Sequence, residues 1–192
     1  SDLMYLQGFG VPAHQRKIAR WLSRLWTSPD GRRGLLMAFR NSGKSTLVGL
    51  FCAWVLYRSP ETRILVMAAD YALAKKMVRN VKRIIERHPL TAGLKPEKAE
   101  QWASDQFTVN RPIELRDPSM LAKGLGANIT GLRADLIICD DVEVPKTCDT
   151  ALKRVELRSH LDELDYIVTP GGIQLYIGTP HSFSISLLLC PL

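Results

Sequence analysis

The run from Ala38 to Thr46 constrains the fold of this chain more than any other part of its sequence. It reads Ala-Phe-Arg-Asn-Ser-Gly-Lys-Ser-Thr, follows the apolar run Gly34–Met37 and opens an apolar, helix-like stretch from Lys44 to Tyr57. A strand, a tight loop and a helix in this order are the context of a phosphate-binding P-loop. Backbone N–H groups of such a loop and of the helix after it point at a polyphosphate.

Each residue type of this loop has an expected task. We expect Lys44 to reach the β- and γ-phosphates of a nucleotide and the Ser45 hydroxyl to bind Mg²⁺. The usual pattern has glycine where Ala38 stands, and a methyl group is tolerated there if φ is negative. A chance match at a helix start is the alternative interpretation. The predicted cradle consists of Ala38, Phe39, Arg40, Asn41, Ser42, Gly43, Lys44, Ser45 and Thr46.

A second run, Ala134–Glu143, is an apolar strand that ends in carboxylates. Continuous apolar runs are typical of buried parallel strands, and open α/β sheets bind ligands at the carboxyl ends of their strands. We expect Asp140 to hold Mg²⁺, directly or through water. Asp141 and Glu143 both qualify as the base that orients and deprotonates the attacking water, and the longer reach of Glu143 favours it. Alone, the run also fits an acidic turn that caps a helix.

A third apolar run, Gly172–Ile177, leads into Gly178, Thr179 and Pro180. A hydroxyl at the end of a strand beside the P-loop can sense whether a γ-phosphate is present. The alternative is an ordinary strand end with a Gly-Pro turn.

The remaining pattern alternates strands and helices, which predicts an α/β fold with a mostly parallel sheet flanked by helices. The chain has 192 residues, the length of one domain. The expected helices are about Pro12–Trp26, Tyr71–His88 and Asp149–Tyr166. The expected strands include Arg63–Ala68 and a possible hairpin of Phe107–Val109 and Ile113–Arg116, and Thr169–Gly172 is expected as a turn.

The charge of the chain favours a polyanionic partner such as nucleic acid. The net charge is +7 and the pI about 9.4. Lysines and arginines gather opposite the apolar face of the helix expected at Tyr71–His88, either as a solvated surface or as a contact to a phosphate backbone. No apolar run has the length of a membrane span. The cysteines lack metal-type spacing, which fits a reducing intracellular setting.

Taken in order, these runs resemble the ATPase domain of phage large terminase subunits, the DNA-packaging motors of tailed phages, and the T7-like group most of all. The resemblance covers about Gly8 to Ser182 and implies a P-loop NTPase of the additional-strand, RecA-like type. The pieces that carry it are Phe9–Gln15, the P-loop with Arg40, Ile129–Glu143, and Ile177–Pro180, which is the coupling motif of the family.

The resemblance also implies roles for single residues. Gln15 would read the adenine edge, and Arg40 would meet the γ-phosphate. Gly178 and Thr179 would couple the nucleotide state to movement. Since motors of this kind form rings, an arginine can act across a subunit boundary. Arg133 is the first candidate, with Arg116 and Arg111 behind it.

The implied activity is Mg²⁺-dependent ATP hydrolysis that drives double-stranded viral DNA into a procapsid in the host cell cytoplasm. The implied partners are DNA, the portal, the small terminase subunit and further copies in a homo-oligomeric ring, with a monomer in isolation. The alternatives are a non-catalytic nucleotide-binding assembly fragment, or another P-loop DNA translocase or helicase core, although a helicase would need a second motor lobe.

The carboxyl-terminal part departs from the family. Family members continue into a lid and an RNase H-like nuclease domain, whereas this sequence stops at Leu192. We therefore expect the whole chain to be the ATPase domain, without nuclease activity. Residues 183–192 do not resemble the family and are expected to be an atypical tail.

Overall fold

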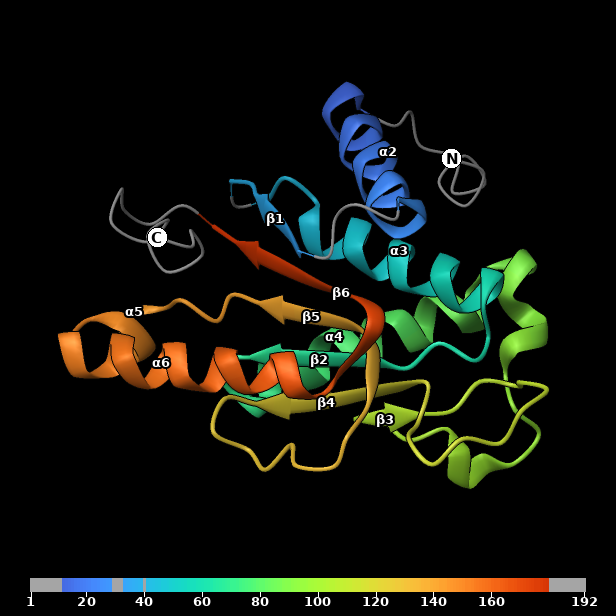
Figure 1. Cartoon of the computed structure of the whole chain (residues 1–192). Helices are drawn as coiled ribbons and strands as arrows, with labels where there is room; N and C mark the ends of the chain where they lie inside the picture. Colours follow the sequence, from blue (N-terminus) through green and yellow to red (C-terminus); the bar gives the residue numbers. More distant parts are fainter. Residues whose placement is uncertain (1–11, 29–32, 40, 180–192) are drawn as a thin grey trace.

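A six-stranded sheet forms the centre of the molecule (Figure 1). The structure is a computed structural model that describes residues 12–28, 33–39 and 41–179. The strand order is β1-β6-β5-β2-β4-β3, and every pairing is parallel except that of β3 with β4. The strands are β1 (Arg33–Met37), β2 (Ile64–Ala68), β3 (Gln106–Phe107), β4 (Met120–Gly124), β5 (Ala134–Asp140) and β6 (Val168–Gly178).

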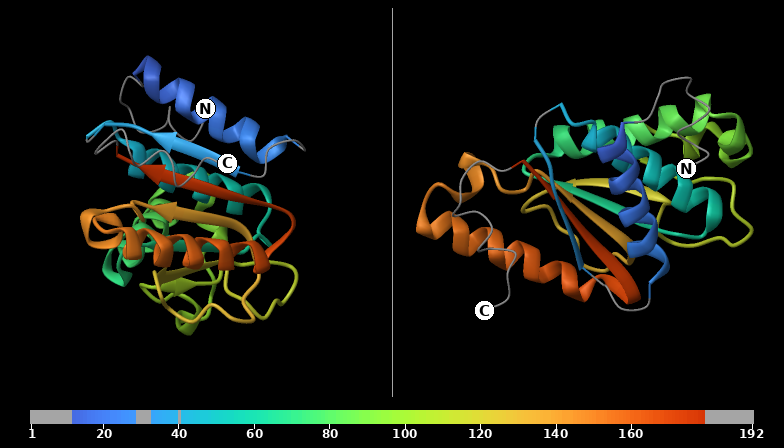
Figure 2. Two further views of the ribbon diagram at one scale, coloured as in Figure 1. Left: turned by 60° about the vertical axis from the view of Figure 1, so that its left-hand side comes forward. Right: turned by 90° about the horizontal axis from the view of Figure 1, so that it is seen from above.

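Helices cover both faces of the sheet. The views of Figures 1 and 2 place α3 and α4 on one side of the sheet and α6 on the other. This arrangement confirms the predicted mostly parallel α/β fold. The α-helices are α2 (Ala13–Thr27), α3 (Lys44–Arg58), α4 (Tyr71–Arg87), α5 (Pro145–Cys148) and α6 (Ala151–Glu163), and the 3₁₀ helices are η1 (Pro89–Leu94), η2 (Ala99–Gln101) and η3 (Leu164–Tyr166).

The central strands are apolar on both faces because both faces are packed. Along β5, Leu136 and Ile138 pack into the core under α3 and α4, whereas Ile137 and Cys139 pack into the core under α6. All four side chains are fully buried. The continuous apolar run in the sequence therefore has the cause expected for a buried parallel strand.

The hairpin expected at Phe107–Val109 and Ile113–Arg116 is wrong. The strand partner of β3 is β4, which joins the sheet parallel to β2. Residues 113–116 lie in an irregular loop instead, closed by the guanidinium of Arg111, whose Nη2 donates to the carbonyl oxygens of Leu115 and Asp117. The β4 run alternates buried and half-buried residues.

The turn expected at Thr169–Gly172 is also wrong, because these residues belong to β6. The pairing of β6 with β5 shifts register there: Ala134 lies opposite Val168, and Leu136 lies opposite Ile173. The extra residues on β6 form a bulge, in which Gly171 has a positive φ of 84°. The turn-like composition of this segment marks the bulge.

The register of the sheet brings the sequence motifs to one edge. Met37 lies opposite Gly178, and Asp140 lies opposite both Ile177 and Ala68. The carboxyl ends of β1, β6, β5 and β2 therefore meet, which is where parallel α/β sheets bind ligands. No helix of the described residues is long and apolar enough to cross a membrane.

Candidate active site

A tight loop joins β1 to α3 at this edge. Asn41 and Gly43 have positive φ angles of 63° and 81°. The backbone angle at Gly43 favours glycine, and a Cβ atom there would lie 2.7 Å from Nε2 of Gln15, so the Gln15 amide would have to move. Gly43 is the N-cap residue of α3 without a side-chain cap, which leaves N–H groups of the first turn for a ligand.

Lys44 lies at the start of α3 and is buried. Its Nζ donates a hydrogen bond to Oγ1 of Thr179 and lies 3.6 Å from Oδ1 of Asp141. The P-loop, the end of β5 and the end of β6 therefore meet at this ammonium group. A carboxylate and a hydroxyl surround the cation.

The end of β6 also connects the two loops through the backbone. The N–H of Ala38 donates to the carbonyl of Gly178 at 3.2 Å, and the N–H of Asp141 donates to the carbonyl of Ile177 at 2.8 Å. Asp141 has a positive φ of 44°, a strained conformation for a residue other than glycine. The P-loop and the loop that begins at Asp141 are thus both hydrogen-bonded to the end of β6, next to Thr179.

Polar atoms without a partner gather at the same edge. Ser42 Oγ, Asp140 Oδ1 and Glu143 Oε1 are buried and have no hydrogen-bond partner among the described residues. Buried polar groups without partners are rare and costly. Their meeting beside a P-loop indicates a site formed to receive a polar ligand.

Burial also changes the proton affinity of the carboxylates. It raises the pKa of Glu143 to about 7. Burial, together with the neighbouring charge of Asp141, raises the pKa of Asp140 to about 6, although the Lys44 cation opposes this shift. A carboxyl group with a pKa near neutrality suits proton transfer at physiological pH.

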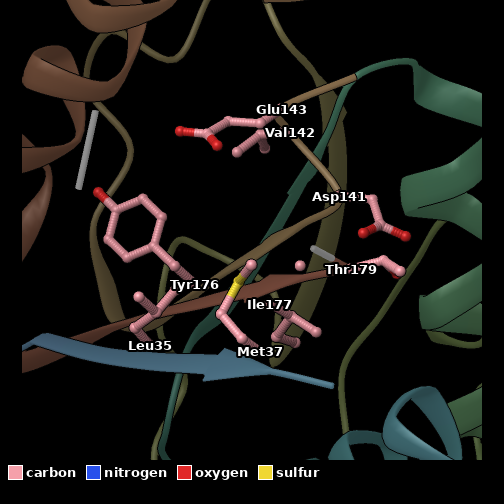
Figure 3. A pocket seen from close by; sticks show the side chains of 9 residues that line it. Leu35, Met37, Asp141, Val142, Glu143, Tyr176, Ile177 and Thr179 are labelled. Carbon is pink, nitrogen blue, oxygen red and sulfur yellow. The ribbon is translucent and has the colours of Figure 1, made fainter. Parts of the chain in front are cut away.

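A small pocket lies beside these groups (Figure 3). Asp141, Glu143 and Thr179 line it together with an apolar side formed by β1 and β6. In Figure 3 the Asp141 side chain lies toward Thr179, whereas the Glu143 carboxylate points away from Asp141. The remaining lining residues are Leu35, Met37, Val142, Tyr176, Ile177 and Gly178.

The oxygen atoms at this edge fit Mg²⁺ in their chemistry. Asp140 offers a buried carboxylate oxygen without a partner, and Ser45 offers an exposed hydroxyl in the first turn of α3. Mg²⁺ usually takes one or two protein oxygens and completes its shell with water and substrate phosphates. Among the described residues there is no cluster of three or more His, Cys, Asp or Glu side chains able to hold a metal.

The side of the loop toward α2 carries Gln15, the residue expected to read adenine. Nε2 of Gln15 donates to the carbonyl of Ser42 at 3.3 Å, so its amide contacts the P-loop. The rings of His14 and Phe39 lie 6.4 Å apart, and Phe39 is 66% exposed. Thr46 is exposed in the first turn of α3. Arg40 lies outside the described residues, as do the expected Phe9–Val11 segment and the 183–192 tail.

The arginines expected to act on a neighbouring subunit lie at the opposite edge of the sheet. Arg133 directly precedes β5, whose other end is Asp140, about 20 Å away at ~3.3 Å per residue. It is exposed, and its backbone N–H donates to Asp117. Arg111 binds carbonyl groups of its own loop, and Arg116 lies beside Gly131. None of the three approaches the P-loop of its own chain.

Sequence reasoning missed the apolar side of the pocket and His14. Leu35 and Met37 are 43% and 39% exposed because they alternate with buried residues on β1. Nothing in the short apolar run Gly34–Met37 marks which side chains alternate toward the pocket. An apolar run before a P-loop instead predicts a strand that is buried throughout. His14 becomes a candidate only when the structure places it beside Phe39.

The sheet order, the loop and the carboxylates at the strand ends define a RecA-like P-loop NTPase fold. Known structures agree with this class. S. cerevisiae Dbp5, solved with Nup159, Gle1, IP6 and ADP, has a TM-score of 0.57 at 10% identity over 97% of this chain and 47% of that chain. A mutant ATPase domain of the Thermus phage P74-26 large terminase has a TM-score of 0.53 at 20% identity over 92% of this chain and 68% of that chain.

Sequence comparison finds a relative within this class. The large terminase subunit of Enterobacteria phage T3 is 31% identical over 163 residues. The match includes 84% of this chain, and the chain spans 28% of that relative's length. No protein-family model matches the chain. The chain is thus a relative of the phage large terminase subunits, in agreement with the resemblance of its motifs.

Proposed function

We propose that this chain is the ATPase domain, at about residues 8–182, of a DNA-packaging motor. It would hydrolyse ATP to drive double-stranded viral DNA into a procapsid, in a homo-oligomeric ring with portal and small-subunit partners in the host cell. The observation that carries the ATPase part is the contact of the P-loop lysine, Lys44, with Asp141 at the carboxyl edge of the sheet, where Asp140 and Glu143 have buried oxygens without partners. The relationship to the T3 large terminase supports the packaging role.

The proposed chemistry uses position and charge. Loop N–H groups and Lys44 hold the phosphates, and Arg40 meets the γ-phosphate. Phosphates replace the carboxylate and hydroxyl that surround Lys44 in this structure. Preorganised cations near the developing charge lower the barrier of phosphoryl transfer. Asp140 and Ser45 would hold Mg²⁺, which supplies additional positive charge to the phosphates.

Glu143 is the proposed base for the attacking water. Its free, buried oxygen and its pKa of about 7 let it accept a proton at neutral pH. Its carboxylate points away from Asp141 in this structure. Asp141 is the competing candidate, because it lies next to Lys44.

Arg133 is the proposed trans-acting arginine. Its position at the far edge of the sheet leaves it without access to its own P-loop, and it is exposed. In a mixture of Arg133→Ala and Glu143→Gln subunits, some interfaces hold both intact residues. Recovery of ATPase activity on mixing supports the role, whereas no recovery in assemblies shown to contain both variants contradicts it.

ATP turnover by purified protein tests the function. Phosphate release that depends on Lys44, even at a low rate, supports a motor ATPase, since a separate subunit lacks the neighbour's arginine. Nucleotide binding without turnover, also in assembled rings with DNA, would instead favour the non-catalytic assembly fragment.

A further inference from the structure

Helix α4 exposes a straight row of basic side chains. Lys76, Arg79, Arg83 and Arg87 are all exposed, and their spacing of three, four and four residues places them along one helical stripe. The opposite face is buried in the core: Ala74, Met77, Val78, Val81 and Ile85. We call these four cations the α4 basic row.

The other charged residues of α4 have partners that turn them to the side. Lys82 donates to the carbonyl of Trp102 at 2.8 Å and lies 5.5 Å from its ring, and Glu86 accepts from the indole N–H of Trp102 at 2.7 Å. Lys75 lies 5.9 Å from the ring of Tyr71. Glu86, the single acidic residue of the helix, is thus hydrogen-bonded to Trp102. The α4 basic row has no ion-pair partner among the described residues.

This arrangement weakens the helix itself. Arg83 is four residues from both Arg79 and Arg87, and like charges at this spacing destabilise a helix. A helix face that only contacts solvent is more stable with glutamates between the cations, because opposite charges at this spacing attract. A polyanion that neutralises the whole row removes the repulsion and releases its own counterions.

We propose that the α4 basic row contacts the phosphate backbone of double-stranded DNA, where the identity of this polyanion rests on the proposed packaging function. From Lys76 to Arg87 the row rises about 17 Å at ~1.5 Å per residue. One DNA strand presents a phosphate about every 3.4 Å along the helix axis, so the row can follow several consecutive phosphates. Contacts of this kind bind DNA without reading its sequence.

Binding of a fluorescent 30-base-pair duplex at increasing salt concentration tests the proposal. The row variant carries Lys76→Gln, Arg79→Gln and Arg83→Gln. The control variant loses the same charge on the other side of the sheet, through Lys146→Gln, Lys153→Gln and Arg154→Gln in α5 and α6. Circular dichroism checks that both variants fold, and ATPase activity without DNA is measured in parallel.

The row variant is expected to flatten the slope of log affinity against log salt by about 2–3 units, since each phosphate contact contributes about 0.9. The control should keep the wild-type slope. An unchanged slope in the row variant, an equal loss in the control, or no duplex binding by the wild type overturns the proposal. Suppose that the wild-type chain binds DNA through the row and yet hydrolyses no ATP. A flatter slope in the row variant would then still support the DNA contact, and only the ATPase function would be contradicted.

Discussion

The two edges of the central sheet hold similar charged residues in opposite states. At the carboxyl edge, Asp140 and Glu143 have buried oxygens without partners, and their pKa values are raised. At the amino edge, Asp135 accepts hydrogen bonds from Arg63 and Thr169, and its pKa is lowered. The unpartnered carboxylates of the carboxyl edge are available to a ligand, whereas Asp135 at the amino edge is paired and stabilises the fold. Among the described residues, the amino edge also holds one cation with a buried atom that lacks a partner, Nη1 of Arg111.

The pair Arg33 and Asp165 strengthens this contrast. Nη2 of Arg33 lies 2.7 Å from Asp165, which also accepts from Gln174, and Tyr176 donates to Gln174 in turn. These hydrogen bonds link β1, η3 and β6, and they give each of these polar side chains a partner. Satisfied networks of this kind fix a conformation, and unsatisfied groups mark a site of function.

Loss of the lysine at the carboxyl edge should have the largest effect. We expect Lys44→Ala to lower ATP turnover or affinity on the order of 10²–10³-fold, because the buried cation that faces the phosphates is gone. Phosphate release and nucleotide affinity measure this, with Lys153→Ala in α6 as the control. Unchanged values for both quantities would remove the P-loop assignment.

The carboxylates of the same edge sharpen the assignment. Glu143→Gln should retain ATP binding and lose turnover on the order of 10²-fold, since an amide positions water but cannot take its proton. The wild-type rate should rise with pH through about 7, where Glu143 loses its proton. If Asp141→Asn alone abolishes turnover, Asp141 is the base and Glu143 has a different role.

At the amino edge a substitution should change stability and leave chemistry intact. Asp135→Asn is expected to lower the free energy of unfolding by about 1–2 kcal/mol, because Arg63 loses a charged acceptor that is only partly screened by solvent. Urea denaturation measures it, with Asp149→Asn at the exposed pair with Lys153 as the control that changes nothing measurable. A loss of turnover in folded Asp135→Asn protein would break the division between the two edges.

The pH dependence of stability should differ in sign between the edges. A raised pKa means that folded Glu143 keeps its proton between its ordinary value of 4.5 and about 7, so its contribution to stability falls as pH rises through this window. Glu143→Gln should therefore gain about 1 kcal/mol over wild type at pH 8 relative to pH 5, after allowance for screening. Asp135, with a lowered pKa, contributes stability that disappears as the pH falls into the acid range.

Urea denaturation at both pH values measures the Glu143 effect. The matched variant Glu61→Gln, at an exposed position between α3 and β2, should show no such pH difference. An equal difference in both variants would mean that burial of Glu143 is not its cause.

Motifs with a backbone mechanism could be predicted from the sequence. The strand before Ala38, the helix from Lys44 and the strand that ends at Asp140 follow from local pattern and turn chemistry, and the structure has them within a residue or so. The mostly parallel sheet followed from their alternation. The same reasoning brought Lys44, Asp141 and Thr179 to one edge, because parallel strands end together.

Features set by tertiary contacts could not be predicted. The strand Met120–Gly124 has a mixed pattern of apolar and polar residues. It forms because it pairs with the side of β2 that β5 does not occupy. The bulge after Val168 looks like a turn because it needs the same residue types. Likewise, periodicity placed Lys82 among the surface cations of α4, whereas its bond to Trp102 depends on a loop that no local pattern reveals.

Hydrogen–deuterium exchange with and without a non-hydrolysable ATP analogue tests most directly whether the nucleotide site lies at the carboxyl edge. We expect slower exchange in residues 41–47 and 140–143 when the analogue and Mg²⁺ are present, with no change around Arg63, Asp135 and Asp165. Lys44→Ala should abolish the difference. Protection at the amino edge, or none at 41–47 at saturating analogue, would contradict the assignment of the two edges.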